Sequence, residues 1–414
     1  MQIIKRLLHY AHIIVRDIIL GFDILGLRID KILHRNDYKN VGLVVDQLNK
    51  GGMERIVIDL YKKYRENNIK SYIIIAGKEA SEYLSEIEDD PRHFRLMYWN
   101  KRNLIKFCKK NKIKTLHYHF STFGMRSAFL AGIKNIYTFH NTYVWLGRRA
   151  WLSLKINLCF CHEKVAVSNF VKKYVTEKAN IKNVRVIPNG VDLEGWLMED
   201  EEKNNRRARG RLKYGIKEDE YLFLNLASFA EQKYQIATLG AFKDVFKKNK
   251  KAKIIFCGAP IDKKIFNRLT KEARTEKDSI LVVDGVFGED VKDLVCSADC
   301  VIMTSIYEGG VPPLSILESI ASGKEVIMTD LGLSGSEFEK FINIIPPIID
   351  DISQLNVKEI KKMVFAKRPQ RYSYISKTME KVMCGNGKKL PEISKEDISL
   401  MSVDRMAKQY IEIL

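Results

Sequence analysis

The sequence lacks the features that would place the protein in a membrane or outside the cell. No run reaches the roughly 18–20 uninterrupted apolar residues that a membrane-spanning helix needs. No secretory cleavage site is visible in the first residues. The seven cysteines show no spacing typical of a disulfide framework. These absences predict a cytoplasmic protein with reduced thiols.

The sequence also shows little sign of a metal site. Cys159, Cys161 and His162 lie within one tetrapeptide, and Cys296 and Cys300 are one helical turn apart. Neither group has a partner cluster at a suitable spacing, so we expect buried, inert thiols. No Asp-any-Asp motif occurs in a context that suits a divalent cation. We therefore expect neither a metal ion nor another cofactor.

Acidic residues are scarce relative to basic ones. The 414 residues include 70 Lys and Arg against 51 Asp and Glu, a formal net charge of +19 at pH 7. Basic clusters occur at residues 101–114, 247–253 and 358–389. An anionic membrane face, nucleic acid and plain solvated helix faces each account for such clusters. Because no recognisable nucleic-acid-binding fold accompanies them, we expect no nucleic acid.

The first 37 residues predict an amphipathic helix. Charged residues interrupt its apolar runs, while apolar residues recur at steps of three and four. The apolar stripe comprises Ile3, Leu7, Ala11, Ile14, Ile18, Phe22, Leu25 and Ile29. Such a basic segment suits a membrane interface, and it equally suits packing on the body of the protein or on a partner.

From Asn40 onward, short β-branched runs alternate with helical stretches. The first set of strands is predicted at residues 41–48, 71–77, 115–120, 135–140, 164–168 and 184–190. After a charge-rich stretch the pattern restarts at residues 221–229, 252–258, 280–285, 300–305 and 325–330. This alternation is typical of parallel sheets with helices on both faces, and the length suits two domains of roughly 150–200 residues. We expect two doubly wound α/β domains.

One stretch, residues 305–330, combines features of a phosphate and sugar site. Its sequence is SIYEGGVPPLSILESIASGKEVIMTD. A glycine-rich turn ahead of a helix presents unpaired backbone N–H groups and the positive end of the helix dipole, which suit a diphosphate. Glu308 and Glu318 supply carboxylates, which accept several hydrogen bonds from sugar hydroxyls. The stretch therefore predicts a pocket for a nucleotide-activated sugar.

Seven stretches, in order, resemble a retaining glycosyltransferase of the family-4 type. They are QLNKGGMERIVIDL (47–60), YTFHN (137–141), VAVSNFVKKYV (165–175), VIPNGVD (186–192), LASFAEQKYQ (226–235), GVFGEDVKDLVCSADCVIMTSIYEG (285–309) and MSVDRMAKQYIEIL (401–414). The resemblance implies the GT-B architecture, in which two Rossmann-like domains face each other across a cleft. The expected boundaries are an N-terminal helical extension (1–37), an acceptor domain (38–198), a linker (199–218), a nucleotide-sugar donor domain (219–395) and a final helix that crosses back (396–414).

The resemblance also implies site residues. His140, Lys233 and Glu308 match residues that contact the reacting sugar and phosphate. The donor would further contact Gly51, Gly52, Gly309, Gly310, Val311 and Glu318, of which Glu318 is expected at a helix start and on the ribose. Tyr143, Trp145, Arg148 and Arg149 are acceptor-side candidates. His117 and His119 share one face of a strand, and we expect them to be core residues rather than cleft residues.

Two departures from the family pattern concern this donor site. The family commonly has an Arg five residues before the lysine, where this chain has Ser228. Nine residues separate Glu308 from Glu318, more than in the usual pattern. These departures suit a non-catalytic module that binds a nucleotide sugar or a glycan.

The resemblance implies transfer of a sugar from a nucleotide-diphosphate donor to a glycan or lipid-linked acceptor, with retention and without a divalent cation. It implies a role in bacterial surface polysaccharide assembly, such as capsule, lipopolysaccharide or exopolysaccharide. A peripheral place on the inner face of the cell membrane follows from the basic patches and the first helix. A nucleotide-sugar epimerase on the same fold is the other alternative.

Overall fold

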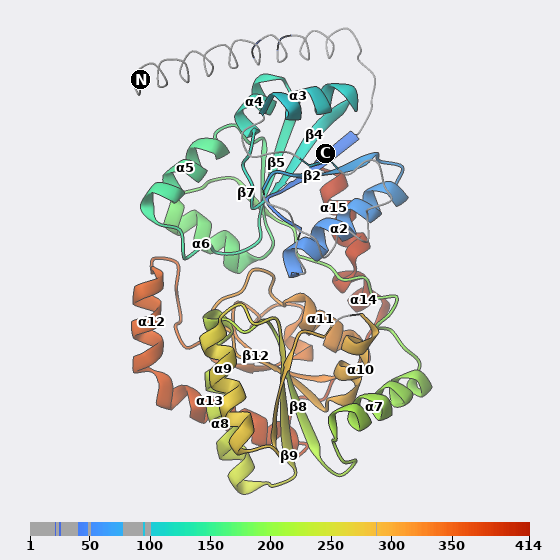
Figure 1. Ribbon diagram of the computed structural model, residues 1–414, viewed down its shortest axis with the longest axis vertical. Helices are drawn as coiled ribbons and strands as arrows, with labels where there is room; N and C mark the ends of the chain where they lie inside the picture. Colours follow the sequence, from blue (N-terminus) through green and yellow to red (C-terminus); the bar gives the residue numbers. More distant parts are fainter. Residues whose placement is uncertain are drawn as a thin grey trace, which may run out of the picture.

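The structure, a computed structural model, describes residues 40–48, 51–77, 94–95, 101–286 and 288–414, together with Gly21 and Leu25. Figure 1 shows two lobes, one above the other, each built on a sheet flanked by helices. The two-domain α/β architecture expected from the sequence is confirmed. Apart from Gly21 and Leu25, the amphipathic helix predicted for residues 1–37 lies outside the described residues.

The N-terminal lobe holds a seven-stranded parallel sheet in the order β3-β2-β1-β4-β5-β6-β7. The strands are β1 (Asn40–Val45), β2 (Ser71–Ile75), β3 (Phe94–Arg95), β4 (Ile113–His119), β5 (Lys134–Phe139), β6 (Glu163–Ala166) and β7 (Val184–Val186). The helices are α2 (Gly52–Glu66), α3 (Lys101–Lys110), α4 (Met125–Leu130), α5 (Arg148–Leu158) and α6 (Asn169–Ala179). All residues of β1 are buried, because helices cover both faces of the sheet.

The C-terminal lobe holds a six-stranded parallel sheet in the order β10-β9-β8-β11-β12-β13. The strands are β8 (Tyr221–Leu226), β9 (Ala252–Gly258), β10 (Ile280–Asp284), β11 (Cys300–Met303), β12 (Glu325–Thr329) and β13 (Asn343–Ile345). The helices are α8 (Gln235–Lys248), α9 (Lys263–Thr275), α10 (Glu289–Ser297), α11 (Leu314–Ala321), α12 (Val357–Ala366) and α13 (Arg368–Met383). In both sheets the strand order reverses beside the first strand, which is where open α/β sheets bind ligands.

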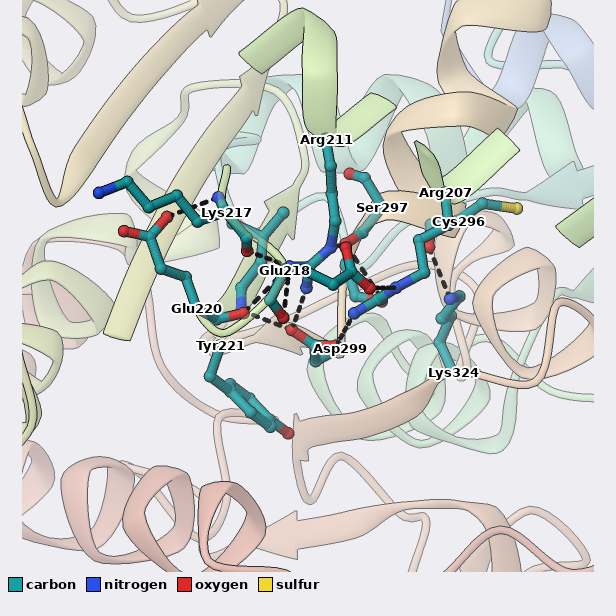
Figure 2. A network of polar contacts seen from close by, with 12 residues as sticks. Arg207, Arg211, Lys217, Glu218, Glu220, Tyr221, Cys296, Ser297, Asp299 and Lys324 are labelled. Atoms are coloured by element: carbon teal, nitrogen blue, oxygen red, sulfur yellow. Dashed lines mark hydrogen bonds and ion pairs between the residues drawn. The ribbon is translucent and has the colours of Figure 1, made fainter. Parts of the chain in front are cut away.

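The charge-rich stretch expected as a linker forms a helix of the C-terminal lobe. This helix, α7 (Asp200–Tyr214), lies against α10. Arg211 is 2% exposed and donates to Asp299 Oδ2 at 2.7 Å and to the carbonyl of Lys217 at 2.6 Å. Arg207 donates to the other oxygen of Asp299 at 2.8 Å, as Figure 2 shows. Paired, hydrogen-bonded charges thus fix α7 to the domain that follows it.

The chain ends on the N-terminal lobe. Helix α14 (Lys395–Met401) is followed by α15 (Val403–Ile411), and Figure 1 shows α15 beside α2. Met406 and Tyr410 of α15 are buried in one apolar cluster with β1 and α2. Tyr410 also reaches β5, where its hydroxyl lies 3.1 Å from Thr138 Oγ1. The C-terminal helix therefore belongs to the core of the first lobe.

Candidate functional site

The loop after β11 brings the two lobes together. Gly309 is buried, and a Cβ atom there would collide with the carbonyl oxygen of His140 at the end of β5. Ser168, the N-cap of α6, donates to the carbonyl of Gly309 at 2.7 Å. A Cβ at Gly310 would lie 2.8 Å from the amide nitrogen of Asn189. Only glycine allows this close approach. Because residues 305–313 contact the N-terminal lobe, we call them the interlobe loop.

Lys233 and Glu308 form an ion pair beside this loop. Lys233 ends the short 3₁₀ turn η2 (Glu231–Lys233), and its Nζ lies 2.5 Å from Glu308 Oε1. Ser305 donates to the same carboxylate oxygen at 2.5 Å. The two charged side chains are 13% and 6% exposed, respectively. A charged, hydrogen-bonded pair is strong in such a largely buried place, and it occupies the ammonium group of Lys233.

His140 stands at the same place, at the carboxyl end of β5. It is 7% exposed, and burial lowers its pKa to about 3. Its Nε2 lies 2.7 Å from Nδ1 of His119, and its backbone N–H donates to the hydroxyl of Tyr143 at 3.4 Å. At neutral pH His140 is therefore an uncharged imidazole.

His117 and His119 are core residues, as expected, but one of them touches the site. Both are fully buried on β4. His117 Nε2 lies 2.8 Å from Thr138 Oγ1, and burial lowers the pKa of His117 to about 3. His119 contacts His140 directly. Sequence reasoning could not show this contact, because it depends on the pairing of β4 with β5.

Glu318 lies in the middle of α11, not at its start as expected. Burial raises its pKa to about 8, against the positive field of Arg55, while Asp59 adds to the rise. Both neighbours belong to α2 of the other lobe, where burial also raises the pKa of Asp59 to about 6. Glu318 thus faces the N-terminal lobe, and its carboxyl is easily protonated.

The Gly51–Gly52 turn starts α2 opposite α11. A Cβ at Gly52 would lie 3.9 Å from the side chain of Leu314, the first residue of α11. Glu54 turns back toward this turn, with its carboxylate 2.5 Å from where a Cβ of Gly51 would lie. Sequence reasoning missed Glu54, although an acidic residue two or three positions into a helix is a known capping signal. Gly52 and the start of α11 therefore approach each other from opposite lobes.

The acceptor-side candidates separate into buried and exposed residues. Tyr143 is 2% exposed, and its ring packs 5.1 Å from that of Phe120. Tyr143 is therefore a core residue, which corrects the expectation that it lines an open acceptor site. Trp145 is 49% exposed and Arg148, at the start of α5, is exposed. These two remain available to a ligand.

Ser228 has an uncharged side chain, so it does not supply the cation that the family pattern has at this position. Its backbone carbonyl accepts a hydrogen bond from Gln235 at 2.8 Å. Among the described residues, no group of three or more His, Cys, Asp or Glu side chains is placed to hold a metal ion. The seven cysteines are free thiols. His162 accepts from the backbone of Asn135 at 3.0 Å, and Cys161 donates to the carbonyl of Glu163 at 2.9 Å.

A surface hollow of about 660 Å³ lies at α14 and α15, away from these residues. Lys340, Asp397 and Arg405 are among its lining side chains. None of the residues predicted to bind the donor lines this hollow. We therefore place the candidate site at the interlobe loop and not at this hollow.

Comparisons with known proteins agree with this geometry. Residues 50–194 match the model of Glycosyltransferase Family 4, and residues 207–352 match that of glycosyl transferases group 1. The chain belongs to the group 1 glycosyltransferases. One relative of this glycosyltransferase is the EpsF protein of Bacillus subtilis (strain 168), whose name describes it as a glycosyltransferase. The two are 26% identical over 322 residues, which cover 70% of this chain and 79% of EpsF.

Solved structures resemble this glycosyltransferase over nearly its whole length. A glycosyltransferase from Rickettsia africae ESF-5 gives a TM-score of 0.65 at 19% identity, covering 91% of this chain and 98% of that one. Anabaena HepE in complex with UDP-glucose gives 0.62 at 13% identity, covering 91% and 100%. At such low identity these likenesses establish the fold alone. They confirm the expected GT-B architecture.

Proposed function

We propose that this glycosyltransferase moves a sugar from a nucleoside-diphosphate donor to a glycan or lipid-linked acceptor, with retention of the anomeric configuration. The observation that carries the proposal is the interlobe loop, which holds Glu308 on Lys233 and places Gly309 against His140. Surface polysaccharide assembly, such as capsule, lipopolysaccharide or exopolysaccharide, is the proposed pathway. The binding of UDP-glucose by HepE supports a nucleotide-sugar donor.

In this proposal the donor's diphosphate binds beside Lys233. Cleavage of the bond between the anomeric carbon and the phosphate leaves negative charge on the departing diphosphate. Lys233 and the backbone N–H groups of Gly309, Gly310 and Val311 would stabilise that charge, and the proposal needs no metal ion. Glu318 and the Gly51–Gly52 turn would hold the nucleotide from the two lobes.

The low basicity of His140 makes it a poor general base for the acceptor. A base that accepts the acceptor's proton works best with a pKa near the operating pH, whereas burial lowers the pKa of His140 to about 3. The departing phosphate is a better proton acceptor. In the proposed reaction the acceptor oxygen attacks the anomeric carbon from the leaving-group face, and its proton goes to the phosphate. His140 would hydrogen-bond to the sugar or phosphate.

A panel of nucleotide sugars tests the donor assignment. We expect one donor to raise the thermal midpoint of the protein and to lose its sugar slowly to water, since a bound activated sugar is accessible to hydrolysis. Proton NMR of the released sugar, read before it mutarotates, should show the donor's anomeric configuration. Conversion of the nucleotide sugar into an epimer would identify an epimerase instead. Binding without hydrolysis or transfer would favour a binding module, and absence of binding would end the proposal.

The exposed side of α5 and the turn before it support an acceptor at an anionic membrane. Trp145, Leu152 and Ile156 are 49%, 60% and 55% exposed. Exposed basic residues lie among them: Arg148, Arg149 and Lys155. The surrounding sequence, residues 91–162, contains 14 Lys and Arg and no Asp or Glu. Apolar side chains set among cations suit the interface of anionic lipids, where each basic residue contributes about 1 kcal/mol.

Vesicle flotation tests this docking surface. The protein should float with anionic vesicles at low salt and dissociate as salt screens the attraction. Replacing Leu152 and Ile156 with Ser and Arg149 with Gln should reduce flotation. A matched variant at exposed Ile261 and Lys263 of the C-terminal lobe should float like the unchanged protein. Equal flotation of both variants would remove α5 from the proposal.

No described helix combines the length and apolarity needed to cross a bilayer.

A further inference from the structure

Two buried histidines lie behind His140. The rings of His117 and His119 are 4.0 Å apart, on one face of β4, and both residues are fully buried. In each ring one nitrogen has a partner: His119 Nδ1 meets His140 Nε2 at 2.7 Å, and His117 Nε2 meets Thr138 Oγ1 at 2.8 Å. The second nitrogen of each, His119 Nε2 and His117 Nδ1, is buried without a hydrogen-bond partner among the described residues.

The unpartnered nitrogen of His119 determines where its proton lies. Burial keeps the pKa of His119 well below 6.5, so the ring is neutral and has one donor and one acceptor nitrogen. A buried N–H without an acceptor is rarer in proteins than a buried lone pair without a donor. The proton of His119 is therefore best placed on Nδ1, where His140 Nε2 accepts it. His140 is also neutral, so it must carry its own proton on Nδ1.

We propose that His119 is a positioning residue, which fixes His140 as the Nδ1–H tautomer and so makes it a hydrogen-bond donor to the sugar nucleotide. No described residue hydrogen-bonds to Nδ1 of His140, so this nitrogen is left for the substrate. The carbonyl of His140 touches Gly309, which places the residue beside the Lys233–Glu308 pair. The inference rests on the proposed function of this site.

The tautomer matters because the donor's reacting groups carry oxygen lone pairs. An Nδ1–H group donates to a phosphate or sugar oxygen, whereas the opposite tautomer would turn a nitrogen lone pair toward an ionised phosphate oxygen and repel it. The hydrogen bond from His119 therefore selects the ring form that can bind an anion without itself being charged. The Nε2 atom of His117 lies 2.8 Å from Thr138 Oγ1, and its ring packs 4.8 Å from that of Tyr410.

Replacing His119 with Asn or with Gln distinguishes a positioning role of this residue from a packing role. The amide nitrogen of Asn occupies nearly the place of Nδ1 of histidine, and that of Gln the place of Nε2. We expect His119→Asn to keep kcat/KM within about threefold of the unchanged enzyme, while His119→Gln loses at least about tenfold. Gln is closer to histidine in volume, so a packing role predicts the reverse order. Equal activities, or better activity of the Gln variant, would overturn the inference.

Nitrogen-15 NMR of the histidine-labelled full chain reads the tautomer without turnover. The signals of His140 are identified by their loss in His140→Gln. We expect the proton on Nδ1 in the unchanged protein and in His119→Asn, and a mixture of tautomers in His119→Gln. A proton on Nε2 of His140 in the unchanged protein would overturn the inference. If no nucleotide sugar is bound or cleaved while Nδ1 still carries the proton, the proposed function fails and the positioning role stands.

Discussion

Lys233 Nζ lies 2.5 Å from Glu308 Oε1, across 75 residues of sequence. The lysine follows the first strand of its sheet, and the glutamate follows the fourth, whose neighbour in the sheet is that first strand. Without a ligand, the Glu308 carboxylate pairs with the Lys233 ammonium group, which we propose binds the diphosphate of the donor. In the proposed function, binding of the donor would replace the Glu308 carboxylate by the diphosphate at Lys233.

Lys233→Ala should lower sugar transfer by at least about tenfold, because it removes roughly 1.4 kcal/mol or more of stabilisation of the departing phosphate. The measurement is kcat/KM with the donor found in the panel. Lys251, which is 64% exposed in its pair with Asp219, offers a matched control, and Lys251→Ala should retain full transfer. A Lys233→Ala enzyme with an unchanged rate would contradict the assignment.

Glu308→Gln should separate binding from transfer. The amide can still accept the hydrogen bond from Ser305, but it no longer holds Lys233 as an ion pair. We expect calorimetry to show nucleoside-diphosphate affinity that is equal or several-fold higher, while transfer falls about tenfold because the carboxylate near the sugar is lost. Weaker nucleotide binding would mean that Glu308 holds the nucleotide directly rather than competing with it.

The affinity for nucleoside diphosphate should rise with pH around Glu318. Its pKa of about 8 means that the carboxyl is protonated below that pH and ionises above it. In the proposed function the ionised form would accept hydrogen bonds from both ribose hydroxyls. Titration calorimetry between about pH 7 and about pH 9 should show this rise, since the diphosphate itself changes little there. In Glu318→Gln the curve should be flat. A pH-dependent rise that persists in the variant would assign the effect to another group.

The Glu318 carboxyl should also make the folded protein less stable as pH rises, whereas nucleotide affinity should increase over the same change. Its folded pKa lies above its ordinary 4.5, so its contribution is fully present below about pH 4.5 and is lost as pH rises through about 8. The thermal midpoints of the unchanged protein and of Glu318→Gln should therefore be closest at low pH. Above about pH 8 the variant should be the more stable of the two. A difference that does not change with pH would contradict the raised pKa.

Gly309→Ala should disable transfer without unfolding the protein. The added Cβ collides with the carbonyl of His140, so the interlobe loop must move away from β5. We expect kcat/KM to fall at least about tenfold, while the protein stays folded and its thermal midpoint falls only slightly. Gly147→Ala is the matched control, because a Cβ there has no neighbour within 4 Å and its φ is −73°. Normal transfer by Gly309→Ala would mean that the loop and His140 separate during the reaction.

Arg211→Met should destabilise the C-terminal lobe. The arginine is 2% exposed, and its removal leaves Asp299 with one fewer cation and several carbonyls without donors. Breaking such a buried pair costs about 3 kcal/mol, measurable as a lower urea midpoint. Lys213 lies on the same helix as Arg211 and forms an exposed pair with Asp290 of α10, so Lys213→Ala should leave that midpoint unchanged. Equal effects of the two variants would show that α7 is not anchored through Arg211.

The sequence predicted the strands that are buried on both faces. Runs such as residues 41–48 and 252–258 are β-branched and continuous, and this pattern depends on neighbouring residues alone. It did not predict β3 or β13, which have two and three residues and lie at sheet edges. It read α7 as a linker, because charged residues in a row look solvated until their partners are known.

The sequence by itself determined the two-domain α/β class, the order of the strands along the chain and the glycine-rich stretch with its two glutamates. Only the tertiary structure decided that Glu308 pairs with Lys233, that Tyr143 is buried and that His119 contacts His140. The physical reason is that parallel strands far apart in sequence lie side by side and end at one edge of a sheet. Contacts at that edge depend on strand order and register, which no local pattern of residues specifies.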